Sequence, residues 1–248
     1  MKIINSTQNK NLKQLCKLHT KKERDHTGLF LVEGAHMIEE AERAQCLMEV
    51  FLLEGMNPLF EDRTTFCSAP VLQKLSNQNS QAKIIGLCKK PKQDPVQEKA
   101  VLILDDIQDP GNAGTLIRTA FSFGIDKIYC SEHTVDFYNP KVLQASQGAI
   151  FHIPVQRDNL QNVISAHQKK GMKILGTCLH QKSVPLSQVR VQEPYGIVLG
   201  NEGQGVHPEL LDLCDDLIKI EMEQFESLNV AIAGGILMYT LRSRFHHA

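Results

Sequence analysis

Short apolar segments alternate with amphipathic segments along most of the chain, which is the pattern of an α/β protein. In the first part, "GLFLVEG", "MEVFLLEG" and "AKIIGLC" predict strands, whereas "AHMIEEAERAQ" and "PVLQKLSNQ" predict helices. Ser6 or Thr7 can cap an earlier helix, because a hydroxyl oxygen can accept a hydrogen bond from the first free N–H groups. These elements predict a small α/β domain.

The alternation continues beyond residue 100. Predicted strands ("AVLILDDI", "IDKIYCS", "FHIPV", "MKILGTCL", "YGIVLG", "LIKIEM") alternate with predicted helices ("AGTLIRTAFSFG", "KVLQASQGA", "LQNVISAHQKKG", "HPELLDLC", "SLNVAIAGGILMYTLRSRF"). Such alternation predicts a mostly parallel sheet covered by helices on both faces. Two prolines and mixed charges interrupt the pattern at 88–100, so we expect a linker there and domains at 1–94 and 95–248.

Composition limits the environment of the chain. Its 248 residues are 42% hydrophobic, enough for one large or two modest cores. The seven cysteines form no C-x-x-C pair and have no histidine at metal-ligand spacing, so we expect neither disulfides nor a metal site and favour the reducing cytoplasm. The longest apolar run, "VAIAGGILMY", is about half of the ~20 residues that span a bilayer. We therefore expect no membrane segment.

Charge is unevenly distributed, although the formal net charge is only −1. Residues 1–24 carry seven Lys or Arg against one acid, whereas residues from 96 onward carry 13 Lys or Arg against 17 Asp or Glu. Lys10, Lys13, Lys17 and Lys21 recur every three or four residues, which predicts one face of a helix. Such a face is either solvated or a contact surface for a polyanion.

Three polar loops follow predicted strands, and ligands of open parallel sheets bind beyond the carboxyl ends of the strands. In "DDIQDPGNAGTLIRTA", Asn112 is a candidate helix cap and Arg118 follows within two turns. In "IVLGNEGQGV", glycines surround Glu202; in "QFESLNVAIAGG", Ser227 and Asn229 precede a helix whose small residues allow close packing. Each loop alone fits an ordinary cap or turn. Because all three fall on one edge of the predicted sheet, we expect them to form one site.

Common nucleotide and hydrolase motifs fit poorly. "GNEGQG" lacks the G-x-G-x-x-G spacing and follows a late strand, whereas a dinucleotide fingerprint opens the first βαβ unit. The sequence contains neither G-K-S nor G-K-T, as a P-loop requires, and no G-x-S-x-G elbow.

The segments "DPGNAGTLIRTAFSFG", "IVLGNEGQGV" and "ESLNVAIAGGILMY", in this order, resemble the three motifs of the SpoU (TrmH-like) branch of the SPOUT RNA methyltransferases. The resemblance covers the chain from about residue 100 to its end. The first domain, especially "FLVEGAHMIEEA", resembles the L30e-like substrate-binding domain that often precedes it. The resemblance implies an S-adenosylmethionine-dependent RNA 2′-O-ribose methyltransferase. It also implies a homodimer with a C-terminal trefoil knot, and we favour ribosomal RNA, of the large subunit, as the substrate.

The resemblance also assigns roles to residues. Arg118 is implied as the central catalytic residue; a guanidinium is always protonated, so stabilising a developing alkoxide or holding a phosphate is easier for it than accepting a proton. Asn112, Glu202, Ser227 and Asn229 are implied to orient the reactants by hydrogen bonds. The lysine face becomes the candidate RNA contact. The implied cofactor-binding residues are Thr177, Leu199, Gly200, Asn201, Ile220, Met222 and Leu228.

One segment departs from the family pattern. Where the family has Ile-Pro-Met followed by glycine, this chain has Ile220, Glu221 and Met222 with neither the proline nor the glycine, so we expect a cofactor loop of altered shape.

Two other functions compete with methyl transfer. A catalytically silent RNA-binding protein of the same fold would have little need of Arg118 or of the "SLN" segment. A nicotinamide-dependent dehydrogenase is the third hypothesis, and a spectroscopic cofactor-binding test separates it from the others.

Overall fold

The computed structural model describes residues 2–76, 81–92, 95–179, 183–224 and 227–242. The chain divides into two compact units, Met1–Lys92 with Tyr138–His152, and Gln93–Phe137 with Ile153–Ala248. The sequence-based division differs, because it placed 138–152 with the second part of the chain. The expected boundary at residue 94 lies outside the described residues, as do the expected helix ends at 78 and 245 and part of the third loop, at 225–226.

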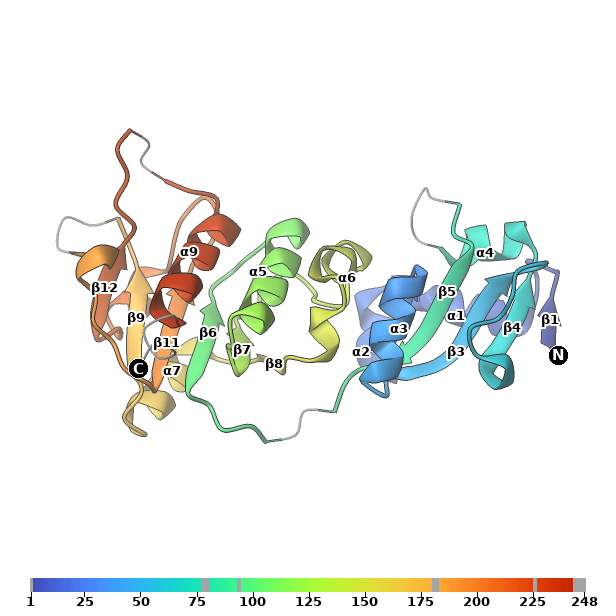
Figure 1. Cartoon of the computed structure of the whole chain (residues 1–248), viewed down its shortest axis with the longest axis horizontal. Helices are drawn as coiled ribbons and strands as arrows, with labels where there is room; N and C mark the ends of the chain where they lie inside the picture. Colours follow the sequence, from blue (N-terminus) through green and yellow to red (C-terminus); the bar gives the residue numbers. More distant parts are fainter. Residues whose placement is uncertain (1, 77–80, 93–94, 180–182, 225–226, 243–248) are drawn as a thin grey trace. The chain divides into compact units, whose positions relative to one another are not determined.

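The first unit contains a mixed five-stranded sheet (Figure 1). Its strands, in spatial order, are β1 (Lys2–Ile4), β4 (Thr64–Cys67), β3 (Leu47–Leu53), β5 (Ile84–Lys89) and β2 (Leu29–Glu33). β1 and β3 pair with β4 in parallel, and β5 is antiparallel to β2 and β3. β1 and β4 were missed from the sequence because both are short, and neither shows an alternating pattern long enough to recognise.

Helices pack on both faces of this sheet. α1 (Lys10–Cys16) and α4 (Ala69–Leu75) bury Leu12 and Leu72 against Phe51. On the opposite face, α3 (Ala35–Arg43) packs so closely that a Cβ on Gly86 would lie 2.9 Å from Ile38. The remaining elements of the unit are the short helices η1 (Lys17–His19), η2 (Glu61–Arg63) and η3 (Ala149–Phe151), with α2 (Lys21–Thr27) and α6 (Pro140–Ser146).

The single lysine-bearing helix predicted near the N-terminus was wrong. Asn9, not Ser6 or Thr7, caps α1 by accepting N–H groups from its first turn, and α1 ends at Cys16. Thr20 has an extended backbone and accepts the N–H of Glu23, so its hydroxyl starts a separate helix, α2. The four candidate lysines therefore lie on three consecutive elements, and all four are exposed: Lys10, Lys13, Lys17 and Lys21.

The second unit contains a seven-stranded sheet in which every recorded pairing is parallel, as predicted. Its spatial order is β10 (Val184–Pro185), β12 (Asp216–Lys219), β9 (Lys173–Thr177), β11 (Tyr195–Leu199), β6 (Ala100–Leu104), β7 (Lys127–Cys130) and β8 (Val155–Arg157). The strand expected at "FHIPV" lies later, in β8, because residues 149–151 form the 3₁₀ turn η3.

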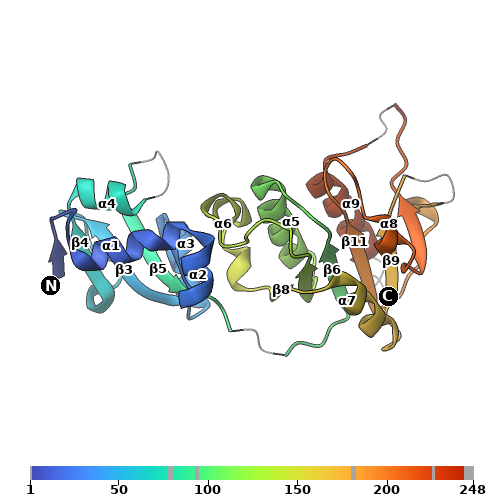
Figure 2. The same ribbon diagram turned by 180° about the vertical axis from the view of Figure 1, so that it is seen from behind.

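Two pairs of helices cover this parallel sheet (Figures 1 and 2). α7 (Leu160–Gln168) and α8 (Pro208–Leu211) share a core with Val101 and Val198. α5 (Pro110–Ser122) and α9 (Val230–Arg242) pack together on the other face. A Cβ on Gly234 of α9 would lie 2.5 Å from Leu116 and 2.8 Å from Leu199, which confirms that small residues permit this close packing. Within the described ranges, no helix is both long and apolar enough to cross a bilayer.

Candidate active site

A cavity of about 440 Å³ lies where β9, β11 and β12 end. Thr177, Leu199 and Ile220 reach it from the carboxyl ends of these three parallel strands. Its volume falls in the range of about 300–1,000 Å³ that is usual for small-molecule sites. All seven positions expected to bind the cofactor line this one cavity: Thr177, Leu199, Gly200, Asn201, Ile220, Met222 and Leu228.

The glycine-rich loop that follows β11 folds tightly on itself. A Cβ on Gly200 would lie 2.1 Å from backbone atoms of Gly205 and Val206, so no other residue fits there without moving the backbone. Gly205 has φ +74°, the left-handed region that favours glycine. Asn201 holds this turn, because its Oδ1 accepts N–H groups of Gly203 (2.9 Å) and Gln204 (3.2 Å). Two of the three glycines are therefore required by the turn itself.

Glu202, in the glycine-rich loop, binds the first of the expected loops and is linked to the third through Asn112. Its carboxylate accepts Nδ2–H of Asn112 (2.9 Å) and the backbone N–H groups of Gln108 (3.3 Å) and Asp109 (3.2 Å). Asn229 Nδ2 in turn donates to Asn112 Oδ1 (2.9 Å). Partial burial acts to raise the pKa of Glu202, but these donors outweigh it and hold the pKa below its usual value. Glu202 is therefore an anion that fixes Asn112.

The capping roles of two asparagines differ from each other. Asn112 does not cap α5; Asp109 does, and its Oδ1 accepts the N–H of Asn112 (2.8 Å). The correction follows from Pro110, which occupies the first helical position and makes the preceding residue the cap. Asn229 caps α9 by accepting the N–H groups of Ala231 (2.9 Å) and Ile232 (3.3 Å), while its amide binds Asn112.

Two expected catalytic residues stay outside this network. Ser227 lines the cavity but makes no recorded hydrogen bond to another described residue. Arg118 is exposed on α5, and no hydrogen bond or ion pair joins its guanidinium group to the described part of the chain. The structure thus brings together Asn112, Glu202 and Asn229 but leaves Arg118 apart from them.

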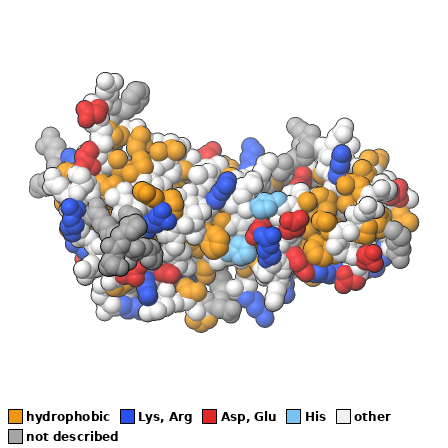
Figure 3. All heavy atoms as spheres, in the orientation of Figure 1, with side chains coloured by type: hydrophobic (Ala, Val, Ile, Leu, Met, Phe, Trp, Pro, Cys, Tyr) orange, Lys and Arg blue, Asp and Glu red, His pale blue; other side chains and the backbone are white. Residues whose placement is uncertain are grey.

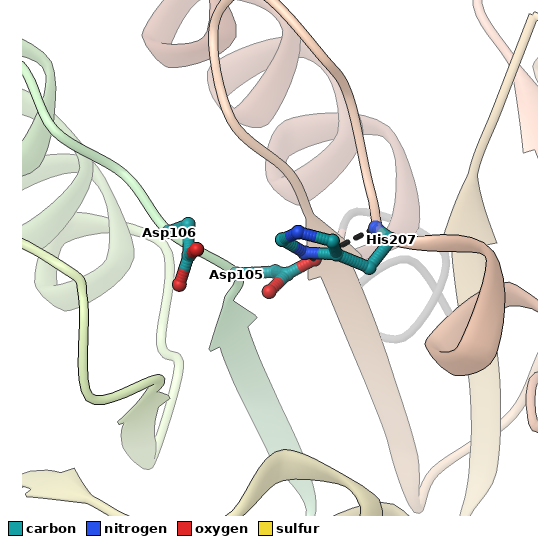
Figure 4. Close-up of side chains that lie close together, drawn as sticks. All are labelled: Asp105, Asp106 and His207. Atoms are coloured by element: carbon teal, nitrogen blue, oxygen red, sulfur yellow. Dashed lines mark hydrogen bonds and ion pairs between the residues drawn. The ribbon is translucent and has the colours of Figure 1, made fainter.

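A second polar cluster beside the loop was missed from the sequence (Figure 4). Asp105, directly after β6, is 3% exposed and accepts both the backbone N–H and Nδ1–H of His207 (2.8 Å each). The carbonyl of Asp106 accepts Nδ2–H of Asn201 (2.9 Å), and its carboxylate accepts the hydroxyl of Ser131 (2.6 Å). Oxygen and nitrogen atoms of the two aspartates and His207 that could bind a metal ion lie within 4.8 Å of one another. Hydrogen bonds account for that arrangement. Asp105 and Asp106 thus hold both ends of the glycine-rich loop.

The pair formed by Asp105 and His207 predicts a pH-dependent stability. The hydrogen bond that His207 donates to Asp105, and then the charge of Asp105, raises the pKa of His207 above the usual value of about 6.5. A raised pKa contributes stability that is complete below that usual value and is lost as the pH rises through the folded-state pKa. We expect His207→Gln to melt below the wild type at pH 6, with a difference that shrinks toward pH 9. Thermal melts across this range, with the exposed His133→Gln as control, check it; a difference that does not vary with pH contradicts the assignment.

Comparison with known families decides what kind of protein carries this site. The model of the SpoU rRNA methylase family matches residues 99–239, which include the whole cavity and the Asn112, Glu202 and Asn229 network. The chain belongs to the SpoU rRNA methylase family. The MRM3-like substrate-binding domain matches residues 9–86. Both matches confirm the resemblances seen in the sequence.

Individual relatives of this SpoU methylase cover nearly its full length. The 23S rRNA (guanosine(2553)-2′-O)-methyltransferase RlmP of Bacillus subtilis is 37% identical over 248 residues, spanning 98% of this chain and 100% of that protein. An rRNA methyltransferase from Sinorhizobium meliloti, with 26% identity and 98% of both chains covered, superposes with a TM-score of 0.88. Its AdoMet-bound structure superposes with a TM-score of 0.87 over the same share of both chains.

The residues around the cavity fit S-adenosylmethionine. The lining combines apolar side chains, such as Ile218 and Leu237, with backbone groups of the glycine-rich loop. Such a mixture suits a ligand that carries both an apolar ring system and polar groups. Asn201 contributes shape to the wall more than direct contact, since its side-chain atoms are engaged within the loop and with Asp106.

Proposed function

We propose that this SpoU methylase transfers a methyl group from S-adenosylmethionine to a ribose 2′-oxygen of ribosomal RNA. The observation that carries the proposal is the hydrogen-bonded chain from Asn229 through Asn112 to Glu202, which itself lines the 440 Å³ cavity. A network built only to cap helices needs no carboxylate at the cavity wall.

The chain's contribution is mainly positioning. S-adenosylmethionine supplies an electrophilic methyl group on a sulfonium. The protein has to hold a ribose hydroxyl in line with that group, and orientation alone can remove much of the barrier. Glu202 fixes Asn112, and Asn229 is fixed by its cap, so both amides are held rigidly beside the cavity. The Ser227 hydroxyl makes no hydrogen bond to another described residue and can donate one to a reactant. Arg118 supplies positive charge to the developing alkoxide or to a neighbouring phosphate.

The exposed surface near Arg118 supports a homodimer in which each site takes residues from both subunits. Large apolar side chains are exposed on α5 and α9: Phe121 (46%), Ile232 (56%) and Tyr239 (54%). Figure 3 shows hydrophobic side chains gathered over α9. Exposed apolar surface of this kind marks protein contacts. A second copy that covers this face would bring Arg118 toward the cavity of its partner. There its guanidinium group, which has no partner in its own described chain, could act on the substrate.

Four further properties remain predictions. They are the trefoil knot, the division into substrate-binding and methyltransferase domains at residue 94, the absence of a metal requirement and the cytoplasmic location. The last is supported by the sequence, in which the seven cysteines form no C-x-x-C pair and no disulfide framework, as is usual in the reducing cytoplasm.

The first unit offers a basic surface for the RNA. Lys10, Lys13 and Lys17 are exposed, and no recorded ion pair engages them within the described chain. Lys21 faces Asp25 at 3.6 Å, with both side chains about half exposed. Because the residues after 95 are net acidic, an RNA polyanion needs attraction elsewhere. These lysines supply it.

Changing Lys13, Lys17 and Lys21 together to Gln should weaken RNA binding whatever the RNA sequence. Phosphate contacts release counterions, so affinity falls with salt at a slope of roughly 0.7–0.9 per neutralised phosphate. The triple variant should flatten that slope by about two units. Titrations of RNA binding at salt concentrations from about 50 to about 200 mM measure the affinity and its salt slope. Unchanged affinity and slope would mean that the RNA docks elsewhere, and cofactor affinity serves as the control.

Mapping 2′-O-methylation in ribosomal RNA tests the function. Cells with and without this gene should differ at one ribose of the large-subunit RNA, and we propose the guanosine that corresponds to the one named for the Bacillus relative. Purified protein with S-adenosylmethionine should restore the methyl group on RNA from the deleted strain. Identical methylation maps in the two strains would refute the proposal.

A further inference from the structure

The segment that departs from the family pattern lies against the cavity. Ile220 and Met222 line it, whereas Glu221 between them does not. β12 ends at Lys219, where its ladder with β10 also ends. Beyond that point, no backbone-to-backbone hydrogen bond is recorded for residues 220–222 within the described chain. The backbone alone therefore does not fix the shape of this part of the wall.

A side chain supplies the missing tie. Glu221 Oε1 accepts the backbone N–H of Ser187 (3.2 Å) and also its hydroxyl. The Ser187 hydroxyl, as the largest cause, holds the pKa of Glu221 below its usual value, so the tie is made by a carboxylate.

The partner of Glu221 is itself held in place. Ser187 belongs to the 3₁₀ helix η4 (Leu186–Gln188), which directly follows β10. Arg190 Nη1 donates to the carbonyls of Ser187 and Val189 (2.9 Å each). Glu221 thus binds the cavity wall to an anchored turn next to the sheet.

We propose that Glu221 is a positioning residue, whose bond to Ser187 holds Ile220 and Met222 in the shape that binds S-adenosylmethionine. The inference rests on the proposed function. A proline at this position would restrict the backbone by fixing φ near −65°, and Glu221 restricts the same backbone through its side chain. The sequence predicted a cofactor loop of altered shape. We infer that a side-chain hydrogen bond fixes this loop where the family has a proline.

Calorimetry of cofactor binding tests this role. Glu221 is exposed, so Glu221→Ala should raise the Kd of S-adenosylmethionine about fivefold, the upper end of what an exposed charged pair contributes. KM for the cofactor should rise with it, while kcat at saturation stays within about twofold, because only binding geometry is lost. Glu223→Ala removes an exposed carboxylate two residues along and should leave Kd unchanged.

A double-mutant cycle separates positioning from general stability. Glu221→Pro should bind the cofactor within about twofold of the wild type, because the ring restores the restriction. Ser187→Ala should weaken binding in the wild type but not in Glu221→Pro, since the pair is coupled only through the carboxylate. Exchange of the Ser187 amide, whose N–H donates to Glu221, should quicken in Glu221→Ala and Glu221→Pro alike, so the restored affinity of Glu221→Pro reports on the cavity wall and not on this bond.

The outcomes distinguish this inference from the proposed function. A wild type that binds no S-adenosylmethionine removes both. A wild type that binds it, together with a folded Glu221→Ala of equal affinity, overturns the role of Glu221 alone. Equal effects of Ser187→Ala in both backgrounds would also overturn it.

Discussion

Arg118→Ala should reduce methyl transfer by about 10³-fold, the loss seen when a single group that stabilises transition-state charge is removed. The fold and the cofactor affinity should remain, because the Arg118 side chain is exposed, makes no hydrogen bond or ion pair with the described chain and does not line the cavity. Single-turnover methyl transfer to RNA, with calorimetry of S-adenosylmethionine binding, measures both quantities. The exposed Lys169→Ala, at the end of α7 on the other face of the sheet, is the matched control for loss of one positive charge.

Mixed dimers extend this test to the site proposed to span two subunits. Arg118→Ala and Glu202→Ala should each be inactive alone. If each site takes Arg118 from one subunit and Glu202 from the other, a mixed dimer contains one intact site and regains activity. Activity that does not rise on mixing, although mixed dimers form, would place Arg118 in its own subunit's site. An Arg118→Ala variant that transfers methyl groups at the wild-type rate would remove this residue from the mechanism.

Gly200→Ala should abolish useful cofactor binding. The added Cβ would lie 2.1 Å from the backbone of Gly205 and Val206, and backbone cannot move aside as a flexible side chain can. Overpacking costs up to about 3 kcal/mol, which corresponds to roughly a hundredfold loss of affinity if the loop absorbs it. Calorimetry and thermal melts measure how the cost divides between binding and stability.

Gly203→Ala is the matched control in the same loop. Its Cβ would meet nothing closer than Asn201 Oδ1 at 3.6 Å, and its backbone does not adopt the left-handed region. We expect stability within about 0.5 kcal/mol of the wild type and an unchanged Kd. If Gly203→Ala binds the cofactor as poorly as Gly200→Ala, a ligand contact and not the tight turn explains the glycines.

The sequence by itself determined the elements that carry local patterns. The alternation of apolar and amphipathic segments predicted the parallel sheet beyond residue 100. Hydrophobic periodicity of strands and helices involves only residues that are close in the sequence, so it can be recognised there. The small residues of α9 predicted its close packing, and three polar loops at strand ends predicted one site. Asn112, Glu202 and Asn229 do meet there. The short strands β1 and β4 were not predicted, since a few residues show too little hydrophobic alternation to identify a strand.

Only the tertiary structure decided how distant residues pair. Asp105 and His207 are 102 residues apart in the sequence, and Glu221 and Ser187 are 34 apart. No local sequence pattern can therefore predict either contact. The same holds for the grouping of 138–152 with the first unit. The N-cap of α5 is Asp109 and not the predicted Asn112, because Pro110 occupies the first helical position. The Asn112 amide therefore binds Glu202. Periodicity fixes which face of an element is buried, but the packing of whole elements determines which side chains meet at its ends.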